Sequence, residues 1–320
     1  TTAHEWRGDT LADALSKEFT DNITVLDGHW HTAVDGGKRF GNVLYTQTGN
    51  YLNNVGLATI NLADPSQKAA SLTSAKSLAD LAENPAVKAL VDEARANFEA
   101  WGSETVIENN PYQLNGERDN VRTRETNLGN LIGDAMLAYG QTGFSHPSDF
   151  AVSNGGGIRA NIEPGKVTVG DIISVLPFGN SISQIKVSGA QVKEMFELSL
   201  RSMAQKDADG NVILDEYKQP KLGANGGFLH VSSTIHVYYD STKRGSLLPA
   251  DDGNDTDKTI VGERVLQIDM QDRKTGKFAP IDDKATYYMA TNDFLAAGGD
   301  GYDMLGGERE EGPSLDTVLM

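Results

Sequence analysis

An Ala-, Lys- and Glu-rich segment divides the chain into two unequal parts. The composition changes at residues 62 to 103, where Asn84-Pro85 opens a helix with apolar side chains along one face. The preceding residues predict one helix and three strands, whereas the following residues alternate irregularly between short strands, helices and glycine-rich turns. We therefore expect an α+β fold with a first part at 1–65, a helical connector at 66–103 and a second domain at 104–320.

Local signals place the main elements within these parts. Leu11, Leu15 and Phe19 recur at the spacing of a helix face. Asn127 is expected to cap a helix that ends at Gly140, and Ser188 with Gln191 forms a capping-box pattern before a further helix. Apolar and β-branched runs predict strands at 23–26, 42–48, 55–61, 150–153, 183–187, 231–239, 265–270 and 286–290.

The acidic composition limits the partners of the chain. Its formal net charge of -17 over 320 residues disfavours nucleic-acid polymers and anionic membrane surfaces, because a field of this sign repels them. No run approaches the roughly 18 apolar residues of a membrane span, and cysteine is absent. This composition suits a bacterial surface protein, although a cytosolic protein could share it. An anionic ligand would need a local cluster of arginines.

A glycine-rich loop follows the strand expected at 150–153. In Asn154-Gly155-Gly156-Gly157-Ile158-Arg159, the glycines permit close approach of a ligand to the backbone, and Arg159 offers a planar cation for a phosphate or carboxylate. A tight strand-to-helix turn explains the glycines equally well. Arg122 and Arg124, just before a helix start, provide a second anion grip or ordinary surface ion pairs.

Two further loops combine an aromatic ring with glycine. Phe294 precedes Gly298-Gly299-Asp300-Gly301, where the ring could stack on a base and Asp300 could accept hydrogen bonds from ribose hydroxyls. A core phenylalanine with a turn-capping aspartate is the alternative. Phe178 lies between Pro177 and Gly179, so the two rings could hold a base between them.

Two histidines stand two residues apart after the strand expected at 23–26. His29 and His31 can turn toward one cavity, although two imidazoles leave a metal site incomplete; solvent-facing histidines of a polar loop are the alternative. The acidic runs Asp207–Asn211 and Asp251–Asp255 lack the full ligand spacing of a calcium loop and are expected to form hairpin turns.

Six motifs in order resemble the family of secreted 5'-nucleotidases that includes ecto-5'-nucleotidase and UDP-sugar hydrolase. The resemblance covers nearly the whole chain and is carried by residues 28–32, 122–129, 154–159, 176–179, 226–229 and 294–301. It implies that 1–65 is the carboxy-terminal end of an α/β metallophosphatase domain and that 104–320 is a nucleotide-recognition domain. It also implies secretion, so that an extracellular, cell-surface or periplasmic location is expected.

The resemblance assigns roles by matching position. His29 and His31 resemble two ligands of a centre with two divalent metals such as Zn or Mn. The substrate contacts implied are polar groups, a pair of rings around the base, an acid on the ribose and a backbone contact: Arg122, Asn154, Arg159, Phe178, Phe294, Asp300 and Gly227.

The remaining metal ligands and the catalytic histidine belong to motifs that precede this loop in the family. None of these motifs is present in the 320 residues, and the first residues show neither an initiator Met nor a signal-peptide pattern. We therefore expect a missing amino-terminal catalytic segment, no catalytic residue in this chain, and a chain that binds nucleotide without hydrolysing it. A stand-alone nucleoside-binding or surface-interaction module, a 2',3'-cyclic-nucleotide phosphodiesterase and a UDP-sugar hydrolase remain alternatives.

Overall fold

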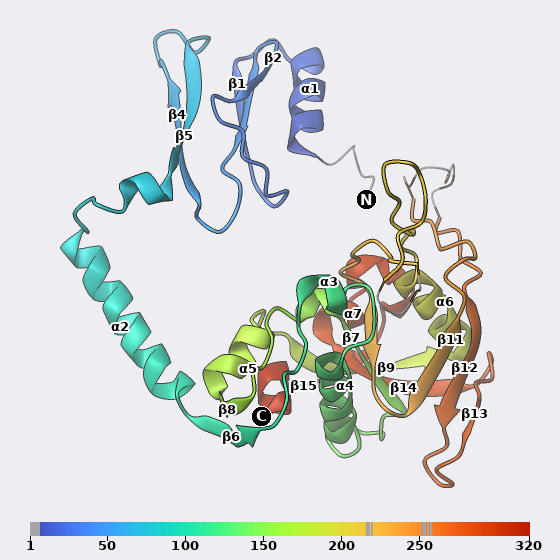
Figure 1. Ribbon diagram of the computed structural model, residues 1–320. Helices are drawn as coiled ribbons and strands as arrows, with labels where there is room; N and C mark the ends of the chain where they lie inside the picture. Colours follow the sequence, from blue (N-terminus) through green and yellow to red (C-terminus); the bar gives the residue numbers. More distant parts are fainter. Residues whose placement is uncertain are drawn as a thin grey trace. The chain divides into compact units, whose positions relative to one another are not determined.

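The chain forms two compact units. The computed structural model describes residues 7–215, 218, 220–249, 251, 254, 256 and 258–320 (Figure 1). Of the described residues, one unit comprises 7–91 with 251, and the other comprises those from 92 onward apart from 251. Helix α2 (Pro85–Gly102) runs across the boundary between them. The expected division at 1–65, 66–103 and 104–320 differs from these units and stays a prediction.

A small sheet carries the core of the first unit. Its central strand β3 (Val43–Gln47) lies parallel to β1 (Ile23–Asp27) and antiparallel to β2 (Lys38–Phe40). Helix α1 (Gly8–Glu18) packs on β3, where Ala12 joins Val43 and Tyr45 in a buried cluster. The predicted helix and the strands at 23–26 and 42–48 are thus present in this unit.

A β-hairpin follows, and it corrects part of the expected connector. Strand β4 (Asn54–Ile60) pairs antiparallel with β5 (Lys68–Ser74) along its whole length. Residues 68–74 are therefore strand, so the helical reading of 66–103 was wrong there. The Ala-rich composition gives no local sign of strand pairing, which depends on β4. Helix α2 begins at Pro85 as predicted, and Asn84 Oδ1 accepts hydrogen bonds from the backbone N–H groups of Ala86 and Val87.

A five-stranded sheet forms the centre of the second unit, in the order β10 (Leu229–Val231), β7 (Phe150–Asn154), β14 (Thr286–Asn292), β9 (Ser181–Ser188) and β15 (Arg309–Ser314). Strands β7 (Phe150–Asn154) and β14 (Thr286–Asn292) are parallel neighbours, and every other neighbouring pair in this sheet is antiparallel. Parallel neighbours end at the same edge of a sheet. Asn154 and Asn292, the last residues of the two strands, are therefore brought to one edge.

Both faces of this sheet are buried, which explains the continuous apolar strands. Phe150 and Val152 enter a cluster with helix α6 (Gly189–Ser199) and the second sheet, whereas Ala151 faces a cluster with helix α4 (Asn127–Gly140). The alternation follows from the two-residue period of a strand. Helices and a second antiparallel sheet thus cover a mixed central sheet, which confirms the α+β class.

Local start signals were right for one helix and displaced by one residue for another. Ser188 and Gln191 form a reciprocal capping box at the start of α6. At α4 the cap is Thr126, whose hydroxyl accepts from the backbone N–H of Gly129 at 3.1 Å. Asn127 was the wrong cap residue, because its side chain instead bonds the preceding loop.

The strand expected at 231–239 is two strands in two sheets. A turn at Ser232 separates β10 (Leu229–Val231), which pairs with β7, from β11 (Ile235–Tyr239), which pairs with β12 (Val265–Gln271). The run of serine and threonine between them lets the chain change sheets. The other elements of the second unit are β6 (Thr105–Asn110), α3 (Arg118–Val121), η3 (Gly155–Gly157), β8 (Gly165–Thr168), α5 (Val169–Val175), β9 (Ser181–Ser188), β13 (Phe278–Pro280), α7 (Asp293–Ala296), η4 (Gly299–Gly301), η5 (Asp303–Leu305), β15 (Arg309–Ser314) and α8 (Leu315–Leu319), while η2 (Ala75–Leu78) follows β5.

Candidate functional site

The ends of β7 and β14 form a hydrogen-bonded cluster with the loop at Asp300. Asn292 Nδ2 donates to Asn154 Oδ1 at 3.0 Å, and Asn154 Nδ2 donates to Asp300 Oδ2 at 2.9 Å. Both asparagines are buried. Residues far apart in the sequence are therefore joined at one sheet edge, and two of them, Asn154 and Asp300, are predicted substrate contacts.

Asp300 is held in an unusual backbone conformation. Its φ of 57° lies in the left-handed region, which a non-glycine residue rarely adopts, and the neighbouring Gly298 and Gly301 also have positive φ. Burial raises the pKa of the Asp300 carboxyl, although the hydrogen bond from Asn154 and the charges of Arg201 and Arg122 act in the opposite direction. The carboxylate is thus fixed in place beside two cations.

The glycines after β7 are required by close packing. Gly155 N–H donates to the carbonyl of Phe228 and Gly156 N–H to that of Gly226, both at 2.7 Å. A Cβ on Gly155 would lie 1.8 Å from the backbone oxygen of Val121. The turn explanation of these glycines therefore accounts for the first two, whose backbone donors are used within the protein.

Gly227 lies directly against the acid. A Cβ at this position would come within 3.2 Å of Asp300 Cβ. Its N–H donates to Asn225 Oδ1 at 3.0 Å, and its carbonyl accepts from the hydroxyl of the buried Tyr302. Gly227 is therefore placed beside Asp300, and its contact with substrate through the backbone stays a prediction.

The two predicted base-stacking rings lie on a loop and a short helix that are joined by a hydrogen bond. Phe178 and Phe294 are 59% and 43% exposed, so both present apolar surface to solvent. Asn180 Nδ2 donates to Asp293 Oδ1 at 2.7 Å, which links the loop of the first ring to the helix that carries the second. The rings are accessible for stacking, and their pairing around a base stays a prediction.

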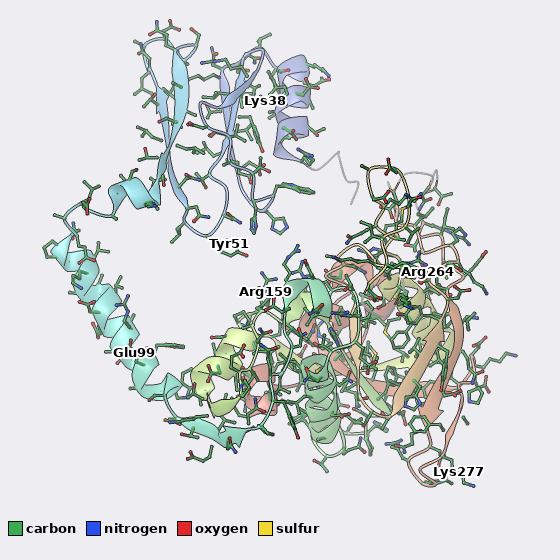
Figure 2. The ribbon with its side chains drawn as sticks, in the orientation of Figure 1. Lys38, Tyr51, Glu99, Arg159, Arg264 and Lys277 are labelled. Atoms are coloured by element: carbon green, nitrogen blue, oxygen red, sulfur yellow. The ribbon has the colours of Figure 1, made fainter. Side chains whose placement is uncertain are left out.

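Arg159 covers part of the Phe178 ring. Its guanidinium carbon lies 5.4 Å from the ring centre, and its Nη1 donates to the carbonyl of Gly156 at 3.2 Å. Figure 2 labels this residue, whose side chain is exposed. Its cation is therefore held beside the glycine turn by the contact with the ring.

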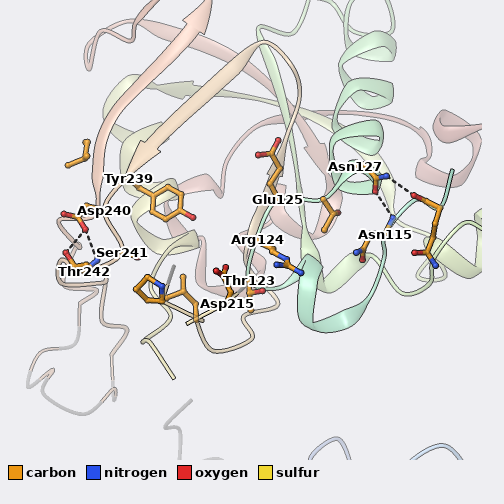
Figure 3. A pocket seen from close by; sticks show the side chains of 15 residues that line it. Asn115, Thr123, Arg124, Glu125, Asn127, Asp215, Tyr239, Asp240, Ser241 and Thr242 are labelled. Atoms are coloured by element: carbon orange, nitrogen blue, oxygen red, sulfur yellow. Dashed lines mark hydrogen bonds between the residues drawn. The ribbon is translucent and has the colours of Figure 1, made fainter. Parts of the chain in front are cut away.

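The two arginines before α4 diverge. Arg122 is close enough for its charge to act on Asp300, and its carbonyl accepts from the N–H of Asn225 at 3.0 Å. Arg124 donates to Asn120 Oδ1 at 2.7 Å and lines a different, broad pocket with Glu125 (Figure 3). The structure thus brings Arg122 to the Asp300 cluster and leaves Arg124 outside it.

The histidine pair belongs to the first unit. His29 and His31 lie on the exposed loop after β1, and both have positive φ, 69° and 57°. His31 packs edge-on to Tyr51, with Asn50 Nδ2 3.5 Å from its Nδ1. Among the described residues, no three His, Cys, Asp or Glu side chains are grouped as a metal site. Two imidazoles fit part of a zinc-type site and do not complete one.

The acidic run Asp207–Asn211 is a turn closed by the side chain of Asp207. Asp207 accepts from the backbone of Asp209 and Asn211 within a hairpin turn, as expected. The turn predicted at Asp251–Asp255 lies largely outside the described residues. No helix among the residues that the structure describes is long and apolar enough to cross a membrane.

Two participants in the cluster were not identified from sequence. Asn292 links the two strand ends, and Arg201 Nη1 donates to the Asp300 carbonyl at 3.4 Å. A signal for Asn292 exists, because an asparagine between a strand and a short helix is a typical N-cap. Nothing local to Arg201 indicates its proximity to residue 300.

The fold and this cluster define a domain with a hydrogen-bonded polar cluster at the edge of a mixed sheet. Residues 104–307 match the family described as 5'-nucleotidase, C-terminal domain, and the chain belongs to this family. The resemblance inferred from the motifs is thereby confirmed.

Relatives with known names agree. The chain is 29% identical over 310 residues to the trifunctional nucleotide phosphoesterase protein of Bacillus subtilis, covering 95% of this chain and 18% of that protein. It is 28% identical over 242 residues to the snake venom 5'-nucleotidase of Crotalus adamanteus, covering 72% of this chain and 34% of that one. The chain thus spans about a third or less of the length of these two curated relatives.

A solved structure shares the fold. The 5'-nucleotidase precursor from Thermus thermophilus superposes with a TM-score of 0.57 at 24% identity, over 98% of this chain and 62% of that one. At this identity the likeness concerns the fold alone.

Proposed function

We propose that this chain is the nucleotide-binding portion of an extracellular, metal-dependent 5'-nucleotidase, which hydrolyses nucleoside 5'-monophosphates to nucleoside and phosphate. The observation that carries the proposal is the orientation of Asp300 by Asn154 at the sheet edge. A carboxylate held in this way accepts two neighbouring hydroxyl donors, the arrangement that a ribose offers.

The surrounding residues fit the other parts of a nucleotide. Phe178 and Phe294 present exposed rings on which a base stacks. Arg122 and Arg159 supply guanidinium groups for the phosphate, in a chain whose overall charge is negative. Asn154 has a second amide hydrogen to donate to the substrate.

The proposed role of this chain is recognition. Divalent ions of the whole enzyme would supply the activation of water, and His29 with His31 would contribute imidazole ligands to them. Because these two ligands do not complete a site, no catalytic step is assigned to this chain. We expect the 320 residues by themselves to bind nucleotide and release no phosphate.

Calorimetry with adenosine and AMP tests the proposal. The wild-type chain should bind both, and Asp300→Ala should weaken adenosine by at least tenfold, since hydrogen bonds to a charged group contribute about 1.5–3 kcal/mol. Asp303→Ala is the matched control, because Asp303 is an exposed acid three residues further along the chain. Equal loss in both variants, or no binding by wild type, would contradict the proposal.

Phosphate release is the second measurement. Robust turnover of AMP by this chain with Mn²⁺ or Zn²⁺ would show that the expectation of inactivity is wrong. The same assay on a protein that includes a preceding catalytic segment should show release.

A broader nucleotide phosphoesterase is the second candidate. The Bacillus subtilis relative matches 95% of this chain, whereas the Crotalus adamanteus 5'-nucleotidase matches 72%. A panel of nucleoside monophosphates, 2',3'-cyclic nucleotides and UDP-sugars on the intact protein separates these activities. Hydrolysis confined to monophosphates supports the first proposal.

A further inference from the structure

Three hydrogen bonds connect the helix that carries Phe294 to the carboxylate of Asp300. The backbone N–H of Leu295 donates to Asn292 Oδ1 at 2.8 Å. Asn292 Nδ2 donates to Asn154 Oδ1, and Asn154 Nδ2 donates to Asp300 Oδ2. Asn292 is 3% exposed, so its contribution is made inside the protein. We infer that Asn292 is a positioning residue, which orients Asn154 and Asp300 for a ribose and couples them to the base-stacking helix; the inference rests on the proposed function.

The groups at its two ends fix the donor-to-acceptor direction of this series of hydrogen bonds. A backbone N–H can only donate, and an ionised carboxylate can only accept. Asn292 must therefore turn its oxygen toward Leu295 and its NH₂ group toward Asn154. Asn154 must then turn its own NH₂ group toward Asp300. Reversal of either amide would place two acceptors or two donors face to face, so one orientation of each amide satisfies every bond.

The direction of this series of hydrogen bonds has a consequence for recognition. Since Asn154 accepts from Asn292, its NH₂ group is committed to the side of Asp300, with one hydrogen left for a ligand. Asn292 is also the N-cap of α7, the helix that begins at Asp293 and carries Phe294. One buried side chain thus sets the position of a base contact and the orientation of a sugar contact.

Asn292→Asp breaks one link and keeps the other. The carboxylate can still accept from the Leu295 N–H, because aspartate is as good an N-cap as asparagine. It has no hydrogen to give to Asn154 Oδ1, so Asn154 loses the partner that sets its orientation. Adenosine binding should weaken about tenfold, the value expected for a disrupted hydrogen-bond network at a charged group.

The readout must distinguish orientation from folding. 2',3'-Dideoxyadenosine lacks the hydroxyls that Asp300 would bind, so its affinity should change about twofold or less in Asn292→Asp. The ratio of the two affinities should therefore fall. On an Asp300→Ala background the substitution should have little further effect on adenosine, because the group it positions is gone.

Asn127→Asp is the matched control. Asn127 also lies in the first turn of a helix, accepts from the backbone N–H of Asn115 at 2.7 Å and donates to the Gln113 carbonyl at 2.9 Å (Figure 3). It therefore undergoes the same chemical change in the broad pocket of Arg124. This variant should bind adenosine within about twofold of wild type.

Each outcome decides between the two claims. If Asp300→Ala leaves adenosine affinity unchanged, the proposed function fails. If Asp300→Ala weakens binding and Asn292→Asp does not, or if Asn292→Asp weakens both nucleosides equally, only the positioning role fails. Should Asn292→Asp lose the folded circular-dichroism spectrum, Asn292→Ser replaces it, since serine keeps the cap and is too short to reach Asn154. The same affinity ratio then decides.

Discussion

The loop of His29 and His31 and the edge of Asn154 and Asp300 hold their polar groups in opposite ways. At the sheet edge, the buried side-chain amides of Asn292 and Asn154 hold the Asp300 carboxylate through a series of hydrogen bonds that starts at a backbone N–H group. In the first unit, the imidazoles are exposed on a loop shaped by residues with positive φ. The comparison teaches that the Asp300 cluster is fixed by groups of its own unit, whereas the two histidines lie on an exposed loop.

The two units also differ in their cores, and core substitutions give the largest predicted effects. Phe150→Ala empties a fully buried position of β7 and should lower the free energy of unfolding of the second unit by about 3–5 kcal/mol. Val43→Ala in β3 should lower that of the first unit by about 2 kcal/mol. Urea unfolding that is monitored by hydrogen exchange in each unit measures both changes in free energy.

Independent cores require that each substitution shift its own transition. If both variants move one common transition equally, the units unfold together and the comparison fails. Leu131→Ala on α4 is the control, because Leu131 is 41% exposed and should cost much less.

The pH dependence of stability should come from the second unit through His230. Burial lowers the pKa of this imidazole to about 4, from an unfolded value of about 6.5, although its hydrogen bond to the Val121 carbonyl acts in the opposite direction. Between these values the unfolded chain binds a proton and the folded chain does not. Stability is therefore fully present above pH 6.5 and falls as the pH decreases toward 4, by on the order of 3 kcal/mol.

His230→Gln should flatten this part of the profile, as measured by urea unfolding between pH 4 and 7. His236→Gln is the matched control, because His236 lies on the next strand along the chain and is exposed, with its ring stacked on Phe278. A profile of His230→Gln that parallels wild type would assign the dependence to other groups.

The base-stacking rings should matter less than the core and more than the histidine loop. Phe178→Ala and Phe294→Ala should each weaken adenosine binding by about 1–3 kcal/mol, the usual contribution of a base on an aromatic ring. Calorimetry measures the change. Phe98→Ala on α2 is the control, since Phe98 is 47% exposed, much like Phe294. Unchanged affinity in both site variants would place the base elsewhere.

The smallest effect on nucleoside binding is expected at the histidines. His29→Asn and His31→Asn remove the imidazoles and keep a residue type that tolerates positive φ. Adenosine affinity should stay within about 0.5 kcal/mol of wild type, whereas titrated Zn²⁺ should bind the variants more weakly. A clear loss of adenosine affinity would show that the two regions are not separate in function.

Elements set by local signals were predictable from sequence. The capping box at Ser188 and the helix start at Asn84-Pro85 need only neighbouring residues, and both were found. Strand β5 was missed because its composition is that of a helix and its partner supplies the pairing. The break at Ser232 was missed because either side of it has strand character.

The candidate site shows the same limit. The motifs named Asn154 and Asp300, and the structure shows them hydrogen-bonded. Sequence could not show that Asn292 joins them, since this depends on β7 and β14 being neighbours and parallel. Nor could it show that Arg122 and Arg124 separate, because that divergence follows from the course of the loop before α4.

The bond from Gly155 N–H to the Phe228 carbonyl also bears on chemical ageing. Asn-Gly pairs lose ammonia when the glycine nitrogen attacks the asparagine side-chain carbonyl, and Asn154-Gly155 is such a pair. Here that nitrogen donates a hydrogen bond of 2.7 Å to the Phe228 carbonyl, and the side-chain oxygen of Asn154 accepts a hydrogen bond from Asn292. Both reacting groups are held by other partners, so the folded protein resists a deamidation that would place a second carboxylate beside Asp300.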